Sequence, residues 1–524
     1  MQVVTNPILK GFNPDPSILR AGDDYYIATS TFEWFPGVQI SHSKDLVNWR
    51  VVSFPLTRYS QLDMRGCPNS GGVWAPCLSY DNGLFYLIYT NARRWAGSFK
   101  DVHNYLVTAP NIEGPWSEPV YLNSSGFDPS LFHDDNGRKW LVNMVWDHRP
   151  GHNCFGGILL QEFDPVQQKL VGPISSIFDG TDIGLVEGPH IYKVNGWYYL
   201  LTAEGGTFTT HAASVARAKS LQGPYEIMPN NPLISSAKNS ELALQSAGHG
   251  SFVQNADGSW LLAHLCRRRL ENGRSILGRE TSLQAIEWID GWPRLAGGGQ
   301  VPLDQTQTTS LSQHPWPAIP ARDDFDHPKL GIQWQAPRVV LDEKFISLQA
   351  RKGHLRLYGR ESIASLFEQT LVARRQQNFK IEASTCVEFS PENFQQMAGL
   401  VAFYNTDSFY YLFITHAQHS KRCLGLMKCE KGVISYPIEK EYPLDDWQQV
   451  CLKLTIDDDR IRFAYSKDTQ HWTNISWEQD ASILSDEHAL PCGFTGNFVG
   501  MACQDISGTG KYADFDWFEY RELE

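Results

Sequence analysis

Asn13-Pro14-Asp15-Pro16-Ser17 is the first copy of a pattern that recurs five times in the first 270 residues. Each copy joins a small polar or acidic cluster to a turn and an aromatic-rich run, which is Asp24-Tyr25-Tyr26-Ile27 in the first copy. The later clusters are Val73-Trp74-Ala75-Pro76, Phe127-Asp128-Pro129-Ser130, Glu187-Gly188-Pro189-His190 and Gly248-His249-Gly250-Ser251. Successive spacings are 59, 54, 59 and 62 residues from Asp15 to Trp74, Asp128, Glu187 and His249. Because a unit of about 40 to 60 residues suits one blade of a radially repeated sheet, the pattern predicts a five-bladed β-propeller.

Three of the five clusters carry a carboxylate, and their shared phase should bring the carboxylates together. Equivalent positions of successive blades face the same part of a propeller, and the first strand of each blade lies nearest the central axis. We therefore expect Asp15, Asp128 and Glu187 to converge at one mouth of the axis. Acidic residues beside prolines are also common turn formers. Five copies in one phase, of which only three are acidic, favour the functional interpretation.

The chain is expected to divide after residue 296. Residues 1–296 form the predicted propeller, and residues 297–322 are rich in Gly, Gln, Thr, Ser and Pro, which is typical of a linker. Residues 323–524 contain short alternating runs such as Leu400-Val401-Ala402-Phe403-Tyr404, without helical periodicity. They predict a β-sandwich of the jelly-roll or concanavalin-like kind, so the whole chain is expected to be all-β.

The composition narrows the classes of function. A net charge of −13 and a pI near 5.7 disfavour nucleic acid as a partner and fit a small neutral ligand. We find no basic leader and no run of about 18 apolar residues, and therefore expect a cytoplasmic protein without a membrane partner. The ten cysteines show no CxxC pair and no dense framework, which indicates buried free thiols in a reducing compartment.

Two aspartates and a glutamate in one site can hydrolyse a glycosidic bond. One group must protonate the leaving oxygen while another activates water or attacks directly, so the two must differ in protonation at one pH. Burial raises the pKa of the acid, whereas hydrogen bonds keep the base ionised. A third carboxylate can orient the acid and keep it protonated by like-charge repulsion. Spacing alone leaves the three roles open, although the longer side chain of Glu187 suits an acid in a partly apolar wall.

The ordered motifs around Asp15, Asp128 and Glu187 resemble glycoside hydrolase family 43. The strings Gly248-His249-Gly250-Ser251 and Leu277-Gly278-Arg279-Glu280-Thr281 are similar to those of its β-xylosidase members, and the resemblance spans nearly the whole chain. It implies that Asp15 is the general base, that Glu187 is the general acid, and that Asp128 orients the acid and modulates its pKa. It also implies single-step inversion, for which the carboxyls of the base and the acid stand roughly 6.5 to 9.5 Å apart.

The same resemblance implies further pocket residues. Arg279 would donate hydrogen bonds to the terminal sugar, although a buried arginine could also be a purely structural partner of Asp15. The remaining side chains that would face the sugar, with core packing as the alternative for the aromatic ones, are Phe32, Trp74, Trp146 and Thr207.

His249 and Phe498 carry two further implications of the resemblance. His249 corresponds to a histidine below the active site where some members hold a divalent cation, so a structural calcium and a hydrogen-bonding role both stay open, and no cofactor is expected to be required. Phe498 corresponds to a residue that a sandwich loop inserts into the propeller mouth, with sandwich core as the alternative. Such a loop would close the pocket and restrict cleavage to chain ends. The segment 266–274 is short against some members, and its three consecutive arginines could form a solvated turn or contact the sugar.

The predicted activity is that of an inverting exo-hydrolase, which releases D-xylose from the non-reducing end of xylobiose and short 1,4-β-xylo-oligosaccharides. α-L-Arabinofuranosidase activity is the nearest alternative, because arabinofuranose and xylopyranose present similarly placed hydroxyls. A fructosidase-like retaining hydrolase would begin with a motif different from that around Asp15. A non-catalytic sugar-binding propeller would need neither an acid nor a base. The expected partner is thus a small sugar, and assembly into a homo-oligomer stays open.

Overall fold

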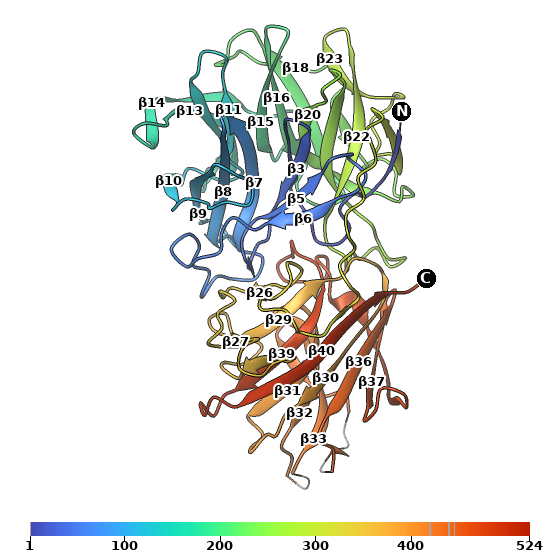
Figure 1. The fold of residues 1–524 in the computed structure, drawn as a ribbon. Coiled ribbons are helices and arrows are strands. Elements are labelled where there is room, and N and C mark those ends of the chain that lie inside the picture. Colours follow the sequence, from blue (N-terminus) through green and yellow to red (C-terminus); the bar gives the residue numbers. More distant parts are fainter. Residues whose placement is uncertain (1, 419–420, 439–440, 445) are drawn as a thin grey trace.

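The computed structural model describes residues 2–418, 421–438, 441–444 and 446–524. These residues form forty β-strands and one short 3-10 helix, Ala481–Ile483, so no described helix has the length or the hydropathy to cross a membrane. Figure 1 shows a propeller built by the N-terminal part of the chain and, in contact with it, a sandwich built by the C-terminal part. The predicted all-β class, with a five-bladed propeller before a β-sandwich, is confirmed.

Each blade is an antiparallel sheet whose strands follow one another in sequence order. Blade 1 contains β2 (Ser17–Ala21), β3 (Asp24–Thr29), β5 (Gln39–Ser43) and β6 (Arg50–Ser53). Blade 2 contains β7 (Gly72–Asp81), β8 (Leu84–Arg94), β9 (Asp101–Ala109) and β10 (Val120–Asn123). Blade 3 contains β11 (Ser130–His133), β12 (Lys139–Trp146), β13 (Phe155–Asp164) and β14 (Lys169–Phe178).

The last two blades follow the same plan. Blade 4 contains β15 (Glu187–Val194), β16 (Trp197–Glu204), β17 (Ala212–Ala218), β18 (Glu226–Ile227) and the short β19 (Ile234–Ser235), which also pairs with β17. Blade 5 contains β20 (Gln245–Gln254), β21 (Trp260–Arg267), β22 (Glu280–Ile289) and β23 (Trp292–Leu295).

Asn-Gly turns connect the first two strands of blades 2 and 4. Asn82-Gly83 joins β7 to β8 and Asn195-Gly196 joins β15 to β16, and both residues of each turn have positive φ. A two-residue turn of this kind matches the twist of the paired strands, and asparagine and glycine tolerate the left-handed backbone that it needs. Such turns depend on local residues alone, which explains why the blade period is visible in the sequence.

Serines of the repeated clusters join neighbouring inner strands. Ser17 Oγ accepts a hydrogen bond of 3.0 Å from a backbone N–H of β7, and Ser251 Oγ accepts one of 2.8 Å from a backbone N–H of β2. Ser130 Oγ donates to the carbonyl of Pro189 in β15 at 2.6 Å. The bonds connect blade 1 to blade 2, blade 5 to blade 1, and blade 3 to blade 4. The repeated motif therefore helps to close the ring in addition to supplying carboxylates.

The segment 297–322, expected to be a linker, belongs partly to the propeller. Its strand β24 (Gln305–Thr308) pairs antiparallel with β1 (Gln2–Thr5), so the two ends of the propeller region are hydrogen-bonded to each other. Residues 309–321 contain no strand. The next strand, β25 (Arg322–Asp323), already pairs with the sandwich strand β40 (Tyr512–Glu522).

Two antiparallel sheets make up the sandwich. Beside β25 and β40, the first sheet contains β27 (Ile346–Ser347), β28 (Leu355–Tyr358), β30 (Lys380–Glu388), β36 (Val450–Asp457), β37 (Arg460–Ser466) and β38 (Thr473–Asp480). The second sheet contains β29 (Thr370–Arg375), β31 (Gln396–Asn405), β32 (Ser408–Thr415), β33 (Cys423–Glu430), β34 (Val433–Ser435), β35 (Tyr442–Pro443) and β39 (Phe498–Asp505).

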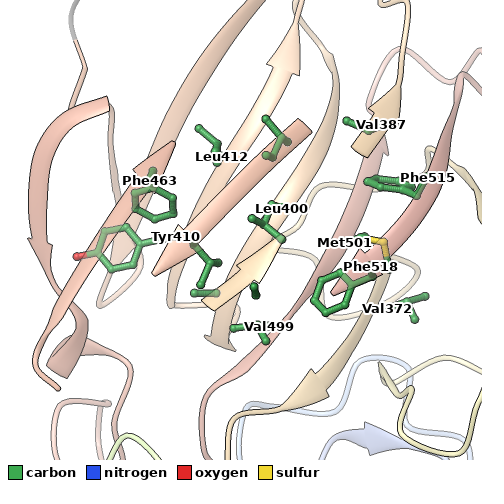
Figure 2. Packing of buried hydrophobic residues seen from close by; sticks show 14 of the residues in the cluster. Val372, Val387, Leu400, Tyr410, Leu412, Phe463, Val499, Met501, Phe515 and Phe518 are labelled. Carbon is green, nitrogen blue, oxygen red and sulfur yellow. The ribbon is translucent and has the colours of Figure 1, made fainter. Parts of the chain in front are cut away.

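Inward-facing residues of both sheets form the sandwich core. Leu400 of β31, Met501 of β39 and Phe515 of β40 are fully buried and belong to one cluster (Figure 2). Removing a buried side chain of this size typically costs about 2 to 5 kcal/mol, because the cavity left behind collapses only in part. The sandwich therefore has a hydrophobic core of its own, apart from the cores between the propeller blades.

Two cysteines depart from the expectation of free thiols. Cys386 of β30 and Cys451 of β36 lie directly opposite each other in the antiparallel register, with their Cα atoms 3.9 Å apart, and form a disulfide. Free thiols are found at Cys67, Cys77, Cys154, Cys266, Cys429, Cys492 and Cys503. The two partners are 65 residues apart in the sequence, so only the pairing of their strands reveals that they meet.

A small sheet joins the two domains. The strand β4 (Trp34–Phe35) of the propeller pairs with β26 (Ala336–Pro337), and the next residue, Arg338, donates its backbone N–H to the carbonyl of Glu33 at 2.7 Å. These bonds hold the start of the sandwich region against blade 1. They set the position from which the sandwich loops reach the mouth of the propeller.

Candidate active site

The three carboxylates stand at the starts of inner strands. Asp15 and Asp128 lie two residues before β2 and β11, and both have a φ of 54°. Glu187 is the first residue of β15. Left-handed backbone outside glycine costs of order 1 to 3 kcal/mol, is tolerated best by Asp and Asn, and is concentrated at functional sites. The two aspartates therefore share one local geometry, and their surroundings must account for any difference between them.

All three carboxylates line one cavity of about 200 Å³, which the propeller and a sandwich loop enclose together. Its other lining residues are Phe32, Trp74, Trp95, Lys100, Phe127, Trp146, Phe155, Gly206, Thr207, His211, His249, Leu265, Arg279 and Phe494. The cavity thus brings together every residue of the predicted set apart from Phe498.

Asp15 is buried in a cationic setting. Arg279 Nη1 donates to Asp15 Oδ1 at 2.7 Å, Ser30 Oγ donates to Oδ2 at 2.6 Å, and His249 Nδ1 lies 3.8 Å from Oδ1. Burial alone would raise the pKa of Asp15, but the charges of Arg279 and His249 and the bond from Ser30 outweigh burial and lower it. Asp15 is therefore ionised at neutral pH.

Glu187 and Asp128 have the opposite tendency. Burial, followed by the charge of Asp15, raises the pKa of Glu187 to about 8. Burial and the charges of Glu187 and Asp15 raise the pKa of Asp128 well above its usual range, although the backbone N–H of Gly188 donates to Asp128 Oδ2 at 3.1 Å. One ionised carboxylate and a protonated one in the same cavity are what acid and base catalysis at a single pH requires.

Aromatic rings form the wall beside the carboxylates. Trp74 meets Phe127 edge-on with centroids 5.4 Å apart, and it also contacts Phe32 and Phe494 at 6.1 and 5.9 Å. Trp146 is half-buried, and its Nε1 donates to the carbonyl of Ser98 at 2.8 Å. Aromatic faces of this kind can pack against the C–H face of a pyranose.

Several polar atoms on the cavity wall have no hydrogen-bond partner within the described part of the chain. They are Thr207 Oγ1, His211 Nε2 and Arg279 Nε. Buried polar atoms in proteins are normally paired, so unpaired ones in a cavity indicate groups that a ligand or water satisfies. Arg279 pairs with Asp15 and also lines the cavity.

Phe498 does not reach the pocket, which corrects the sequence expectation. Its side chain is fully buried, stacks on Trp34 with ring centroids 3.6 Å apart, and meets Phe12 at 6.0 Å. As the first residue of β39, it is held in the sheet and packs between the two domains. The aromatic residue that the sandwich contributes to the cavity is Phe494, from the loop before β39.

Close backbone contact places this loop. A Cβ at Gly278 would lie 2.1 Å from the carbonyl oxygen of Thr495, so the segment that precedes Arg279 and the loop that carries Phe494 touch directly. Asn497 donates its backbone N–H to the carbonyl of Ile276 at 2.9 Å. Sequence reasoning missed Phe494 because such a contact joins residues more than 200 positions apart.

The other residues that sequence reasoning missed lie mostly in loops between blade strands. They are Trp95, Lys100, Phe127, Phe155, Gly206, His211 and Leu265. Phe127 directly precedes Asp128 in a quoted motif and could have been included on that ground. The Nζ atom of Lys100 lies 4.2 Å from the centroid of the Trp146 ring. Lys100 lies outside the repeated clusters, so the repeat did not predict it as a site residue.

The acidic side chains near His249 offer few ligands for calcium. Calcium takes six to eight oxygen ligands. The carboxylate nearest to His249 belongs to Asp15, which is already paired with Arg279. Among the described residues, no group of three or more His, Cys, Asp and Glu side chains is arranged to hold a metal ion. Burial lowers the pKa of His249, although the charge of Asp15 opposes this shift, and the imidazole can hydrogen-bond near the carboxylates.

The three consecutive arginines of segment 266–274, Arg267 to Arg269, are bonded within the protein and do not form a solvated turn. Arg267 is fully buried, and its Nη2 donates to Asp486 of the sandwich at 2.9 Å. Arg268 forms two bonds of 2.7 Å to Glu280, and Arg269 donates to Ser246. None of them lines the cavity. The segment therefore bonds the last blade internally and to the sandwich.

A five-bladed propeller whose cavity holds an ionised carboxylate, a protonated carboxyl and an aromatic wall has the features expected of a glycoside hydrolase. Residues 4–293 match the glycosyl hydrolases family 43, and residues 322–521 match the β-xylosidase C-terminal concanavalin A-like domain. The chain belongs to glycosyl hydrolase family 43.

Relatives are similar over the full length. The β-xylosidase of Bacillus subtilis (strain 168) is 49% identical, with 99% of both chains covered. Xylosidase/arabinosidase 43B of Humicola insolens is also 49% identical, covering 100% of this chain and 98% of the relative. The crystal structure of xylan β-1,4-xylosidase from Bacillus halodurans C-125 has a TM-score of 0.98 at 54% identity, covering 99% of this chain and 100% of the other.

Proposed function

We propose that this protein is an inverting exo-β-D-xylosidase that releases D-xylose from the non-reducing end of xylobiose and short 1,4-β-xylo-oligosaccharides. The observation that carries the proposal is the cavity of about 200 Å³ in which Asp15, Asp128 and Glu187 meet. The full-length similarity to the two xylosidases named above supports xylose as the sugar. Enclosure by the sandwich loop favours the end of a chain over its interior.

In the proposed mechanism, Asp15 acts as the base. Its pairing with Arg279 and Ser30 keeps the carboxylate ionised and fixes its orientation. From this position it takes a proton from a water molecule that attacks the anomeric carbon. The attack comes from the face opposite the leaving group and therefore inverts the configuration.

Glu187 acts as the acid in this scheme. Burial and the nearby charge of Asp15 keep its carboxyl protonated near neutral pH, so that it can give its proton to the departing glycosidic oxygen. Asp128 is held next to the acid by the backbone N–H of Gly188, a position from which it would orient Glu187. General acid catalysis of this kind contributes about 10² to 10⁴ in rate.

The sugar would be held by the cavity wall. Arg279 and Thr207 offer donors to its hydroxyls, and the rings of Phe32, Trp74 and Trp146 offer apolar faces to its C–H groups. Phe494 would close the side of the cavity that faces the sandwich.

α-L-Arabinofuranosidase activity is a second candidate, either as a side activity or as the main one. It is supported by the 49% identity to the xylosidase/arabinosidase of Humicola insolens. Comparing kcat/KM for 4-nitrophenyl β-D-xylopyranoside and 4-nitrophenyl α-L-arabinofuranoside ranks the two. A higher value for the arabinofuranoside would reverse the assignment.

Proton NMR of xylobiose during the first turnovers tests the main proposal. Inversion gives early α-xylose from the cleaved end, before mutarotation. Early β-xylose would contradict the inverting mechanism but would still support xylobiose as a substrate. Absence of cleavage would leave the arabinofuranoside, and after it simple sugar binding, as the function to test.

We also propose that hydrolysis needs no metal cofactor, because the donor set around His249 lacks the oxygen ligands of a calcium site. Dialysis against EDTA is therefore expected to leave kcat and the unfolding temperature unchanged. A loss of either that added calcium restores would contradict the proposal.

Assembly into a homo-oligomer and cytoplasmic location stay predictions, for light scattering and cell fractionation to check.

A further inference from the structure

A second cavity, of about 640 Å³, lies between blade 1 and the sandwich. Residues of the N-terminal segment, of β5 and β6, of the connecting segment and of β29 line it, and it shares no lining residue with the cavity that holds the carboxylates.

All charged side chains that line this cavity are cationic. Four of its lining residues are cationic, namely Lys10, Arg50, Arg374 and Arg375, and none is Asp or Glu. The whole chain carries a net charge of −13, so a cavity whose charged lining residues are all cationic is opposite in sign to the protein as a whole. A concave, one-signed surface concentrates counter-ions of the opposite sign.

Arg375 is the least compensated of these cations. Its exposed fraction is 9%, its Nη1 donates to Gln39, and its Nε and Nη2 have no hydrogen-bond partner among the described residues. The rings of Phe12 and Phe498 lie 5.4 and 5.6 Å from its guanidinium carbon. Burial lowers its pKa to about 9, with no acidic neighbour that raises it.

Other buried arginines of this protein have acidic neighbours. Arg267 pairs with Asp486 and Arg279 pairs with Asp15. The adjacent Arg374 lies over the ring of Tyr520, and the negative charges of Glu522 and Asp323 oppose the loss of its proton. A buried cation without a counter-charge costs several kcal/mol, so a structure that retains one indicates a missing partner.

We propose that the interdomain cavity binds a small anionic molecule through a phosphate or carboxylate group, which neutralises Arg375. The volume exceeds the need of an inorganic ion, and the half-buried rings of Trp49 and Trp316 offer it apolar walls. An acidic sugar and an organic phosphate both have this chemistry. Because propeller and sandwich residues both line the cavity, the bound anion stabilises the contact between the domains.

A short chain of hydrogen bonds connects this cavity to the segment that carries Asp15. Arg375 donates to Gln39, and Gln39 Nε2 donates to Asn13 Oδ1 at 2.6 Å. Asn13 stands two residues before Asp15. An anion bound to Arg375 would therefore lie two hydrogen bonds away from Asn13, which belongs to the same segment as Asp15.

Unfolding temperatures measured against inorganic phosphate and against glucuronate test the proposal, with sodium chloride at equal ionic strength as reference. We expect a saturable rise for at least one of the two anions. In Arg375→Met the apparent Kd should be roughly ten- to a hundredfold weaker, as expected for a charge-assisted hydrogen bond. Arg460→Met, an exposed arginine of β37, is the matched control and should bind as the wild type does.

The outcomes separate the sources of the anion. A response to glucuronate alone identifies an acidic sugar, and a response to phosphate alone identifies a phosphate group. No saturable response to either, or equal binding by Arg375→Met, overturns the proposal. Should Arg375→Met fail to fold, the exposed Arg50→Gln provides the same comparison with a smaller loss. The measurement uses no xylan substrate, so its result is independent of the proposed hydrolase activity.

Discussion

Asp15 and Asp128 demonstrate how neighbours assign a chemical role to a residue. Both precede a Pro-Ser pair and both have a φ of 54°, yet the pKa of one is lowered and that of the other is raised. The difference in pKa comes from Arg279 and Ser30, which hydrogen-bond to Asp15 and not to Asp128. Asp128 is buried beside other carboxyls instead. The same Asp-Pro-Ser string thus carries a carboxyl of lowered pKa at one position and one of raised pKa at the other.

Replacing the proposed acid should depend on the leaving group. In Glu187→Gln, kcat for xylobiose should fall by about 10² to 10⁴, because the leaving sugar needs a proton. The fall should be much smaller for 2,4-dinitrophenyl β-D-xyloside, whose leaving group needs none. Steady-state kinetics on both substrates provides the check, with the exposed Glu226→Gln as control. Equal losses on the two substrates would argue against an acid at Glu187.

The pH profile of kcat/KM should have two limbs. Activity requires an ionised base and is lost as pH falls through the lowered pKa of Asp15. It also requires a protonated acid and is lost as pH rises through the pKa of Glu187, about 8. In Arg279→Gln both pKa values should rise, because the positive charge lowers each of them. If both limbs of the Arg279→Gln profile have the same pKa values as those of the wild type, the assignment of these limbs to Asp15 and Glu187 is contradicted.

At the scale of elements, regular strands and their connecting loops have different origins. Strand pairing within a blade follows from local turns such as Asn195-Gly196 and from alternating burial along the strands. The loop before β39 is placed instead by distant contacts with residues 276–278. Its shape decides which of two aromatic residues, Phe494 or Phe498, faces the pocket.

Alanine variants of these two residues should behave differently. Phe494→Ala should raise KM for xylobiose and leave the free energy of unfolding nearly unchanged, because the ring is half-buried on the cavity wall. Phe498→Ala should lower that free energy by about 3 to 5 kcal/mol, since it removes a fully buried ring stacked on Trp34. Kinetics and urea unfolding of both variants measure the contrast. The converse pattern would restore Phe498 to the pocket.

The molecule as a whole depends on charges buried between its domains. Arg267 of blade 5 and Asp486 of the sandwich are both fully buried and bond at 2.9 Å, and Tyr404 Oη donates to the same carboxyl at 2.6 Å. Desolvation raises the pKa of Asp486 to about 6 even beside the arginine. Such a pair adds little net stability, but either partner left alone is costly.

Breaking this pair from one side should destabilise the whole protein. Asp486→Asn is expected to lower the free energy of unfolding by about 3 to 5 kcal/mol, because Arg267 then stays buried without its full counter-charge. The double variant Arg267→Met with Asp486→Leu should recover most of that loss. Urea unfolding of Arg267→Met, of Asp486→Leu and of the double variant completes the cycle. Additive losses would show that the two charges do not depend on each other.

The sequence by itself determined the all-β class, the five blades, the sandwich and the three carboxylates. It could do so because blade period, turn residues and strand alternation are local properties that repeat in one phase, and phase alone brings Asp15, Asp128 and Glu187 to one mouth. The tertiary structure decided the rest: which carboxyl is ionised, that Phe494 reaches the pocket, that Cys386 pairs with Cys451, and that Arg375 is left without a counter-charge. Each of these depends on burial and on contacts between residues far apart in the chain, which no local pattern records.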